Sequence, residues 1–142
     1  MNKYILLFTL LVVSQMQLAA QNHIAATISN FENNKGICRA CLFKTAADFK
    51  NNKALQCAQA VVTNGKAQVS FTNLPDGNYA IFVFHDSNTN GKMDKNWLGI
   101  PNEGYGASGN KLPFAAAPKF EANQFTLARG VTLNLSIKLR NL

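Results

Sequence analysis

The sequence lacks a cluster of basic residues, although it carries 14 lysines and arginines against only 7 aspartates and glutamates. The basic residues are spread singly along the chain, and no group of them alternates with aromatic residues on one element. A nucleic-acid-binding surface needs such a patch, so we expect no nucleic-acid partner. We attribute the positive charge to a lysine-rich surface that is attracted only weakly to acidic polymers.

A second long apolar run is also missing. The first 20 residues contain one early charge at Lys3, an apolar run from Ile5 to Val13, and small residues at Ala19 and Ala20. This layout predicts a secretory signal peptide over residues 1–20, cleaved after Ala20. The run is shorter than the ~20 apolar residues of a membrane span, and the alternative is an uncleaved anchor. We therefore expect an exported protein without a transmembrane segment after cleavage: periplasmic, attached to the cell surface, or secreted.

Cysteine is scarce, with only Cys38, Cys41 and Cys57. A single C-x-x-C is weak evidence for zinc, and Leu42 follows it where haem attachment requires histidine. If Cys38 and Cys41 lie in one strand, their separation is about 10 Å. A disulfide spans roughly 7 Å at most between Cα atoms, so these two cannot bond to each other. We expect Cys57 to pair with either Cys38 or Cys41, and the third cysteine to be buried and free.

Residues 21–142 contain no stretch of ten or more residues with the pattern of an amphipathic helix. We expect these residues to form one domain. Apolar residues alternate strictly between Val131 and Arg140, which predicts a strand with one buried face. Residues 77–86 are apolar on both faces, which predicts a central strand. Residues 120–127 also suggest a strand, and residues 45–52 a single helical turn. The pattern indicates an all-β fold, an antiparallel Ig-like β-sandwich of about seven strands.

The longest region without a strand pattern, Ser87 to Ala117, begins beside a regular array of side-chain oxygens. Asp86, Asn88 and Asn90 alternate, and Gly91 and Asp94 follow, as in the first nine positions of an EF-hand loop. A strand precedes this array, and the twelfth position is Trp97, so it is not an EF-hand. We predict a weak calcium site, with a dissociation constant on the order of 10⁻⁴ M. The predicted ligands are Asp86, Asn88, Asn90, the Lys92 carbonyl and Asp94, with Glu103, a further carbonyl or water completing the shell. The alternative is a polar hairpin turn at Asn90–Gly91.

Three further residues near this loop are candidates for ligand binding: His85, Trp97 and Tyr105. A histidine at a strand end usually serves a structural role, and no nucleophile accompanies it. The two aromatic residues suit either a sugar platform or the edge of a core. The Gly104–Gly109 segment matches G-x-G-x-x-G, but it follows a loop and precedes Pro113, which excludes a dinucleotide site.

The central third of the chain, "LPDGNYAIFVFHDSNTNGKMDKNWLGIPNEGYGASGN", resembles the DUF2141 family of exported bacterial proteins. The departures from the family pattern are Ala107, where phenylalanine is usual, and Gly109, where asparagine is usual. The resemblance implies a transthyretin-like β-sandwich and no particular activity. The matching residues are Gly77, Tyr79, Ala80, Phe84, His85, Asp86, Asn88, Asn90, Gly91, Asp94, Asn96, Gly99, Pro101, Glu103, Tyr105, Gly106 and Ser108.

Two functions follow from these observations as hypotheses. The first is a non-enzymatic exported binding or structural module whose loop is ordered by calcium, with a cell-surface polysaccharide or protein as partner. The second is a carbohydrate-binding protein or hydrolase that uses the same loop as its site. A concave pocket that brings His85 and Glu103 together would favour the second hypothesis, and a surface that packs them away would favour the first.

Overall fold

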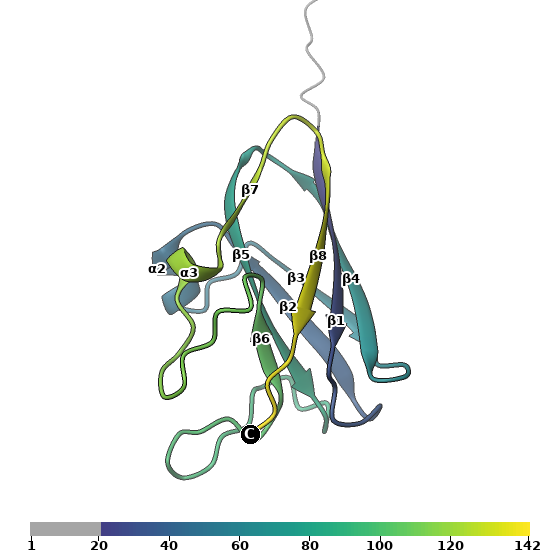
Figure 1. Cartoon of the computed structure of the whole chain (residues 1–142), viewed down its shortest axis with the longest axis vertical. Coiled ribbons are helices and arrows are strands. Elements are labelled where there is room, and N and C mark those ends of the chain that lie inside the picture. Colours follow the sequence, from purple (N-terminus) through teal and green to yellow (C-terminus); the bar gives the residue numbers. More distant parts are fainter. Residues whose placement is uncertain (1–20) are drawn as a thin grey trace, which may run out of the picture.

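A computed structural model describes residues 21–142, so the expected signal peptide lies outside the described residues. The chain forms two β-sheets that pack face to face (Figure 1). The first sheet has the order β4-β1-β8, with β1 at Asn22–Ser29, β4 at Lys66–Leu74 and β8 at Thr132–Lys138. The second has the order β3-β2-β5-β6, with β3 at Gln56–Val61, β2 at Ile37–Phe43, β5 at Gly77–Asp86 and β6 at Tyr105–Ala107. A further short strand, β7 at Phe125–Leu127, also pairs with β5.

The core lies between the two sheets, as the alternation of apolar residues predicts. In β1, the side chains of Ile24, Ala26 and Ile28 are buried, and the residues between them are half-buried. Strand β5 is central, because it pairs with β2 on one edge and with β6 and β7 on the other. The prediction of a central strand is therefore confirmed, and so is the all-β sandwich class. The outer face of β5 is only partly covered, since Phe82 and Phe84 are half-buried.

Three details differ from the sequence-based predictions. Strand β8 runs parallel to β1, so the sandwich is not wholly antiparallel. The chain reaches β8 by crossing over from the other sheet, and such a crossover permits a parallel pair where a hairpin does not. The strand predicted over residues 120–127 begins only at Phe125, because Phe120 and Asn123 both turn inward from a helical turn. Strand β6 was not predicted, since its three residues are too few for a periodic pattern.

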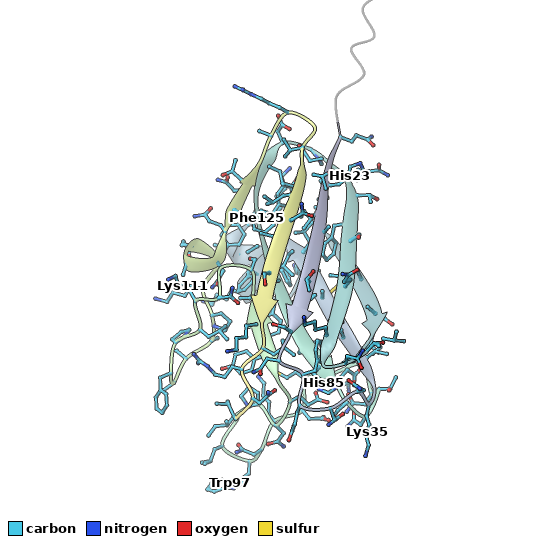
Figure 2. All side chains as sticks on the ribbon, turned by 45° about the vertical axis from the view of Figure 1, so that its right-hand side comes forward. His23, Lys35, His85, Trp97, Lys111 and Phe125 are labelled. Carbon is cyan, nitrogen blue, oxygen red and sulfur yellow. A yellow bond between two sulfur atoms is a disulfide. The ribbon has the colours of Figure 1, made fainter. Side chains whose placement is uncertain are left out.

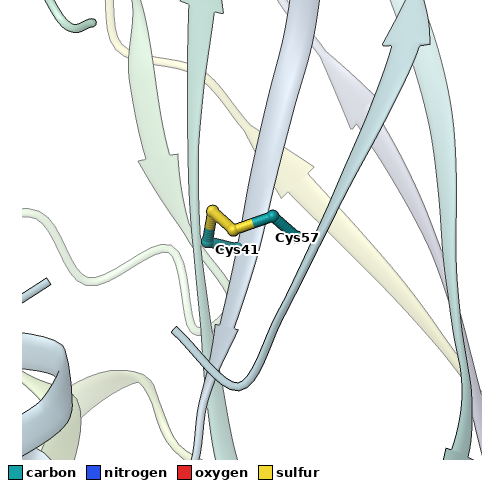
Figure 3. Close-up of a disulfide and its surroundings, with 2 residues drawn as sticks. All are labelled: Cys41 and Cys57. Carbon is teal, nitrogen blue, oxygen red and sulfur yellow. A yellow bond between two sulfur atoms is a disulfide. The ribbon is translucent and has the colours of Figure 1, made fainter. Parts of the chain in front are cut away.

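The disulfide lies between β2 and β3, where Cys41 and Cys57 stand directly opposite each other (Figure 3). Cys38 is a free, buried thiol. It is an odd number of residues from Cys41, so its side chain lies on the opposite face of the strand. Burial raises the pKa of Cys38 to about 12, which keeps the thiol protonated at neutral pH.

Two short helices, α2 at Ala46–Lys50 and α3 at Phe120–Asn123, lie beside each other on the outer side of the β5 sheet (Figure 1). The single helical turn expected over residues 45–52 corresponds to α2. The Phe49 ring of α2 is 6.4 Å from Phe82 of β5 and 6.2 Å from Phe120 of α3. Aromatic rings therefore fix both helices to the sheet. Within residues 21–142, no helix combines the length and the apolar character needed to cross a membrane.

Candidate functional site

Asp86 ends β5 and anchors the loop that follows. Its side chain is fully buried, and each carboxylate oxygen accepts hydrogen bonds from protein groups. Oδ1 accepts from the backbone N–H of Asn90 at 2.9 Å, and Oδ2 accepts from the N–H of Gly91 at 2.9 Å. Arg39 of β2 also donates its Nε–H to Oδ2 at 2.5 Å. The carboxylate therefore closes the loop back onto its own beginning, and an arginine balances its charge.

The environment of Asp86 keeps this carboxylate ionised. Burial raises its pKa, but the hydrogen bonds from Arg39, Gly91 and Asn90 outweigh that effect, and the net shift of the pKa is downward. Arg39 was not among the candidate residues, because its role depends on the register between β2 and β5. That register is set by long-range pairing, which the local sequence does not encode.

The side chains of Asn88, Asn90 and Asp94 meet on the outer side of the loop. The amide nitrogen of Asn88 donates to Asp94 Oδ2 at 2.7 Å, and that of Asn90 donates to both Asp94 oxygens at 3.0 Å. The side-chain oxygen Oδ1 of Asn88 accepts from the backbone N–H of Asn90, and Oδ1 of Asn90 accepts from the backbone N–H of Lys92. The alternating oxygens thus form successive turns in which each side chain also reaches Asp94.

Glu103 folds back onto both ends of the loop. Its side chain is buried, and Oε1 accepts from the backbone N–H of Ser87 at 3.0 Å and from the Ser87 hydroxyl at 3.2 Å. Oε2 accepts from the N–H of Asp94 at 3.1 Å. The Glu103 side chain therefore links residue 87 to residue 94, while the Asp86 side chain holds residues 90 and 91.

The predicted calcium ligands therefore belong to one connected network. Asp86 and Glu103 are buried and already accept backbone N–H groups, whereas Asn88, Asn90 and Asp94 are the more accessible of the predicted side-chain ligands. A rotation of the two asparagine amides would turn their oxygens toward Asp94, at the cost of the hydrogen bonds that these oxygens accept from the N–H groups of Asn90 and Lys92. Within the described chain, no three His, Cys, Asp or Glu side chains gather around one point, so a cation here would need amide and backbone oxygens. The calcium site stays a prediction.

A glycine and a threonine with unusual backbone environments lie against this network. A Cβ at Gly36, whose φ is 66°, would overlap the carbonyl oxygen of Asp86 and the Cα of Ser87. The turn between β1 and β2 therefore passes directly under the start of the loop. Thr89 has a φ of 59°, a conformation that a β-branched residue rarely adopts. Asn90 and Gly91 follow Thr89 directly, and their hydrogen bonds to the Asp86 carboxylate hold the loop in this conformation.

The other three candidates lie in different surroundings. His85 is buried, with Nε2 2.7 Å from the carbonyl oxygen of Lys35 and its ring against Phe31 at 5.0 Å. Tyr105 is buried and stacks on Phe82. Trp97 is 90% exposed and lies at the end of the loop, far from His85 (Figure 2). The three residues therefore do not line a common site.

A cavity of about 910 Å³ lies on the outer side of the β5 sheet, between the loop and the segment that precedes α3. Its lining is mainly apolar and includes neither His85 nor Glu103. The local sequence gave no signal for this cavity except the apolar segment "PFAAAP", residues 113–118, which is not part of any strand. The lining comes from Ala46, Phe49, Lys50, Asn52, Phe82, Met93, Lys95, Leu98, Gly99, Ile100, Pro101, Tyr105, Phe114, Ala115, Ala116, Ala117, Pro118, Lys119, Phe120, Glu121 and Leu142.

The protein is therefore a β-sandwich in which the carboxylates of Asp86 and Glu103 hold a loop rich in Asp and Asn, and this loop lies beside an apolar cavity. The family model described as "Uncharacterized protein conserved in bacteria (DUF2141)" matches residues 26–134. The chain belongs to this family. Neither the curated proteins nor the solved structures yielded a match to the chain.

Proposed function

We propose that this protein is an exported, non-enzymatic binding module whose ligand site is the apolar cavity beside the Asp86–Glu103 loop. One observation carries the proposal: the polar groups suited to catalysis are engaged in structural hydrogen bonds, whereas the apolar groups around the cavity are not covered. His85 and Glu103 bond to the backbone, while Phe114 is 96% exposed and Leu98 61%. Largely apolar cavities of this size are typical of small-molecule sites.

A neutral apolar dye tests this binding function without assuming a charged ligand. We expect N-phenylnaphthylamine to become fluorescent with the wild-type protein and to lose part of that signal with Ala116→Trp, whose ring would occupy part of the cavity. Val61→Trp is the matched control, because Val61 is 72% exposed on β3 and does not line the cavity. Equal dye binding by both variants, or no binding by the wild type, would contradict the proposal.

Calcium is the second part of the proposed function, as a stabiliser of the loop that forms one wall of the cavity. The support is the convergence of Asn88, Asn90 and Asp94 next to the Lys92 backbone. Binding to the folded state alone, at a hundredfold excess over the dissociation constant, would stabilise the protein by about 2.7 kcal/mol. We expect millimolar calcium to raise the melting temperature relative to EDTA, and Asp94→Asn to abolish most of that rise. Glu32→Gln, at an exposed carboxylate in a different loop, is the control. A melting temperature that calcium does not change would contradict calcium binding by the loop.

A carbohydrate platform is the alternative, and the exposure of Trp97 favours it. A planar sugar face stacks on such a ring, but the second predicted aromatic residue, Tyr105, is buried under Phe82. Retention on immobilised cell-wall polysaccharide, with loss on Trp97→Ala and no loss on Ala116→Trp, would establish this alternative over the cavity.

A further inference from the structure

The cavity has a rigid floor and two different walls. The ring of Phe49 packs against those of Phe82 and Phe120, and these three side chains, from α2, β5 and α3, form the floor. One wall is the fastened loop, which contributes Leu98 and Ile100. The other wall is the segment from Phe114 to Ala117, whose residues are all exposed. An apolar ligand would therefore bury side chains that are in contact with water in the free protein.

Each of the three segments around the cavity also contributes one lysine. Lys50 ends α2, Lys95 belongs to the loop, and Lys119 precedes α3. All three are exposed, and none has a salt bridge within the described residues. Glu121 is the acidic side chain in the lining. The rim therefore has an excess of positive charge over an apolar interior, which complements a ligand that is apolar at one end and anionic at the other.

We propose that the cavity binds a single anionic amphiphile, with its acyl chain on the aromatic floor and its carboxylate among Lys50, Lys95 and Lys119. This inference rests on the proposed binding function and names its ligand class. A single molecule fits better than a membrane surface, because the apolar residues face a cavity rather than form a flat or convex patch. Long lysine side chains reach a carboxylate at the rim while their apolar stems contact the chain below.

The test compares three probes that share one alkyl chain and differ in head-group charge. Dodecanoate, dodecanol and dodecyltrimethylammonium are titrated into the protein over residues 21–142, the two charged probes below their micelle concentrations and dodecanol below its solubility limit. Binding is followed by calorimetry and by backbone amide shifts. We expect dodecanoate to bind most tightly and the cationic probe least, with shifts concentrated at residues 95–101 and 114–120. Vesicles of anionic or neutral phospholipid form a separate arm, in which we expect no binding to either composition.

Charge-reversal variants separate the lysines from the apolar interior. The double variant Lys95→Glu/Lys119→Glu is expected to weaken dodecanoate binding roughly tenfold and to leave dodecanol binding unchanged. Lys66→Glu is the matched control, because Lys66 is exposed on β4 and is not part of the lining. These positions are on the surface, so the variants are expected to fold, and their melting temperatures check this.

Each result has a defined meaning. Equal binding of all three probes at the cavity would overturn the anionic preference but leave the binding function intact. Binding of no probe at the cavity would overturn both. Binding to anionic vesicles alone would replace the single ligand by a membrane surface. Concentration-dependent dimerisation that Phe114→Ser removes would show that a second copy of the chain covers the cavity, and would also overturn the proposal.

Discussion

Two long connections form the walls of the cavity, and the chain holds them by different means. Residues 87–104 are held at several points along their length, since the side chains of Asp86, Asn96 and Glu103 accept hydrogen bonds from their backbone N–H groups. Residues 109–119 are held only near their ends, where Asn123 bonds to Lys111 and Lys119 and Arg140 bonds to the carbonyls of Leu112 and Pro113. Within the described structure, the N–H groups of residues 115–117 have no hydrogen-bond partner.

This difference in hydrogen bonding indicates that the two walls differ in rigidity and play different parts in ligand binding. Buried carboxylates that accept several N–H groups make one connection rigid, because each bond would be lost if the loop changed shape. A connection with free N–H groups and exposed apolar side chains changes conformation at little cost. We therefore expect the loop to define the shape of the cavity and the second connection to adjust to the ligand.

The largest expected effect comes from removing the anchor of the rigid wall. Asp86→Ala leaves Arg39 without its partner and the N–H groups of Asn90 and Gly91 without an acceptor. Breaking a buried pair of this kind costs about 3 kcal/mol or more. Urea unfolding of the variant checks this, with Glu32→Ala, an exposed carboxylate, as the control. A loss below about 1 kcal/mol would show that Asp86 is not the anchor.

Glu103→Gln should weaken the same wall by a smaller amount. The amide keeps one acceptor oxygen, so either the N–H of Ser87 or that of Asp94 loses its partner. We expect a loss of about 1–2 kcal/mol in the free energy of unfolding, with the fold unchanged by circular dichroism. An effect as large as that of Asp86→Ala would mean that the hydrogen bonds of Glu103 contribute as much to stability as those of Asp86.

The ionisation of Asp86 should make the loop sensitive to acid. Because its pKa is lower in the folded state, its stabilising contribution is complete above its unfolded pKa of about 3.9 and is lost as the pH falls through the folded value. We expect the stability difference between wild type and Asp86→Asn to be constant from pH 7 to about pH 5 and to shrink below about pH 4. A difference that does not change down to about pH 2 would contradict the lowered pKa.

The flexible wall should tolerate substitution, and two phenylalanines of the same region test this. Phe114 is 96% exposed and Phe120 is 8% exposed. Phe114→Ser is expected to change the free energy of unfolding by less than about 0.5 kcal/mol, whereas Phe120→Ser is expected to cost about 3 kcal/mol. Similar losses for both would show that Phe114 is packed in solution and that the wall is not free.

The sequence predicted the sandwich class and the rigid wall better than the flexible one. Strict alternation near the C-terminus and the two apolar faces of residues 77–86 are local patterns, so the strands and the central position of β5 followed from them. The oxygen spacing from Asp86 to Asp94 located the loop, and Glu103 was singled out as a residue that returns to it. These features depend on short-range geometry, which local residue choice encodes.

The remainder depends on contacts that no local pattern reveals. Arg39 reaches Asp86 through the pairing of β2 with β5, and the cavity requires α2 and α3 to lie side by side on the outer face of the β5 sheet. The parallel pairing of β8 with β1 results from a crossover between sheets. Residues 113–118 combine two prolines with apolar residues and have neither helical nor strand period, so their apolar composition was the only local signal of a cavity wall.

Amide hydrogen exchange at single-residue resolution tests the contrast between the two walls most directly. We predict slow exchange for the N–H groups of Ser87, Asn90, Gly91 and Asp94, because each donates to a buried carboxylate. We predict exchange close to that of an unstructured chain for residues 115–117. Equally fast exchange at both sets of amides would contradict the account, since it would show that Asp86 and Glu103 do not hold the loop.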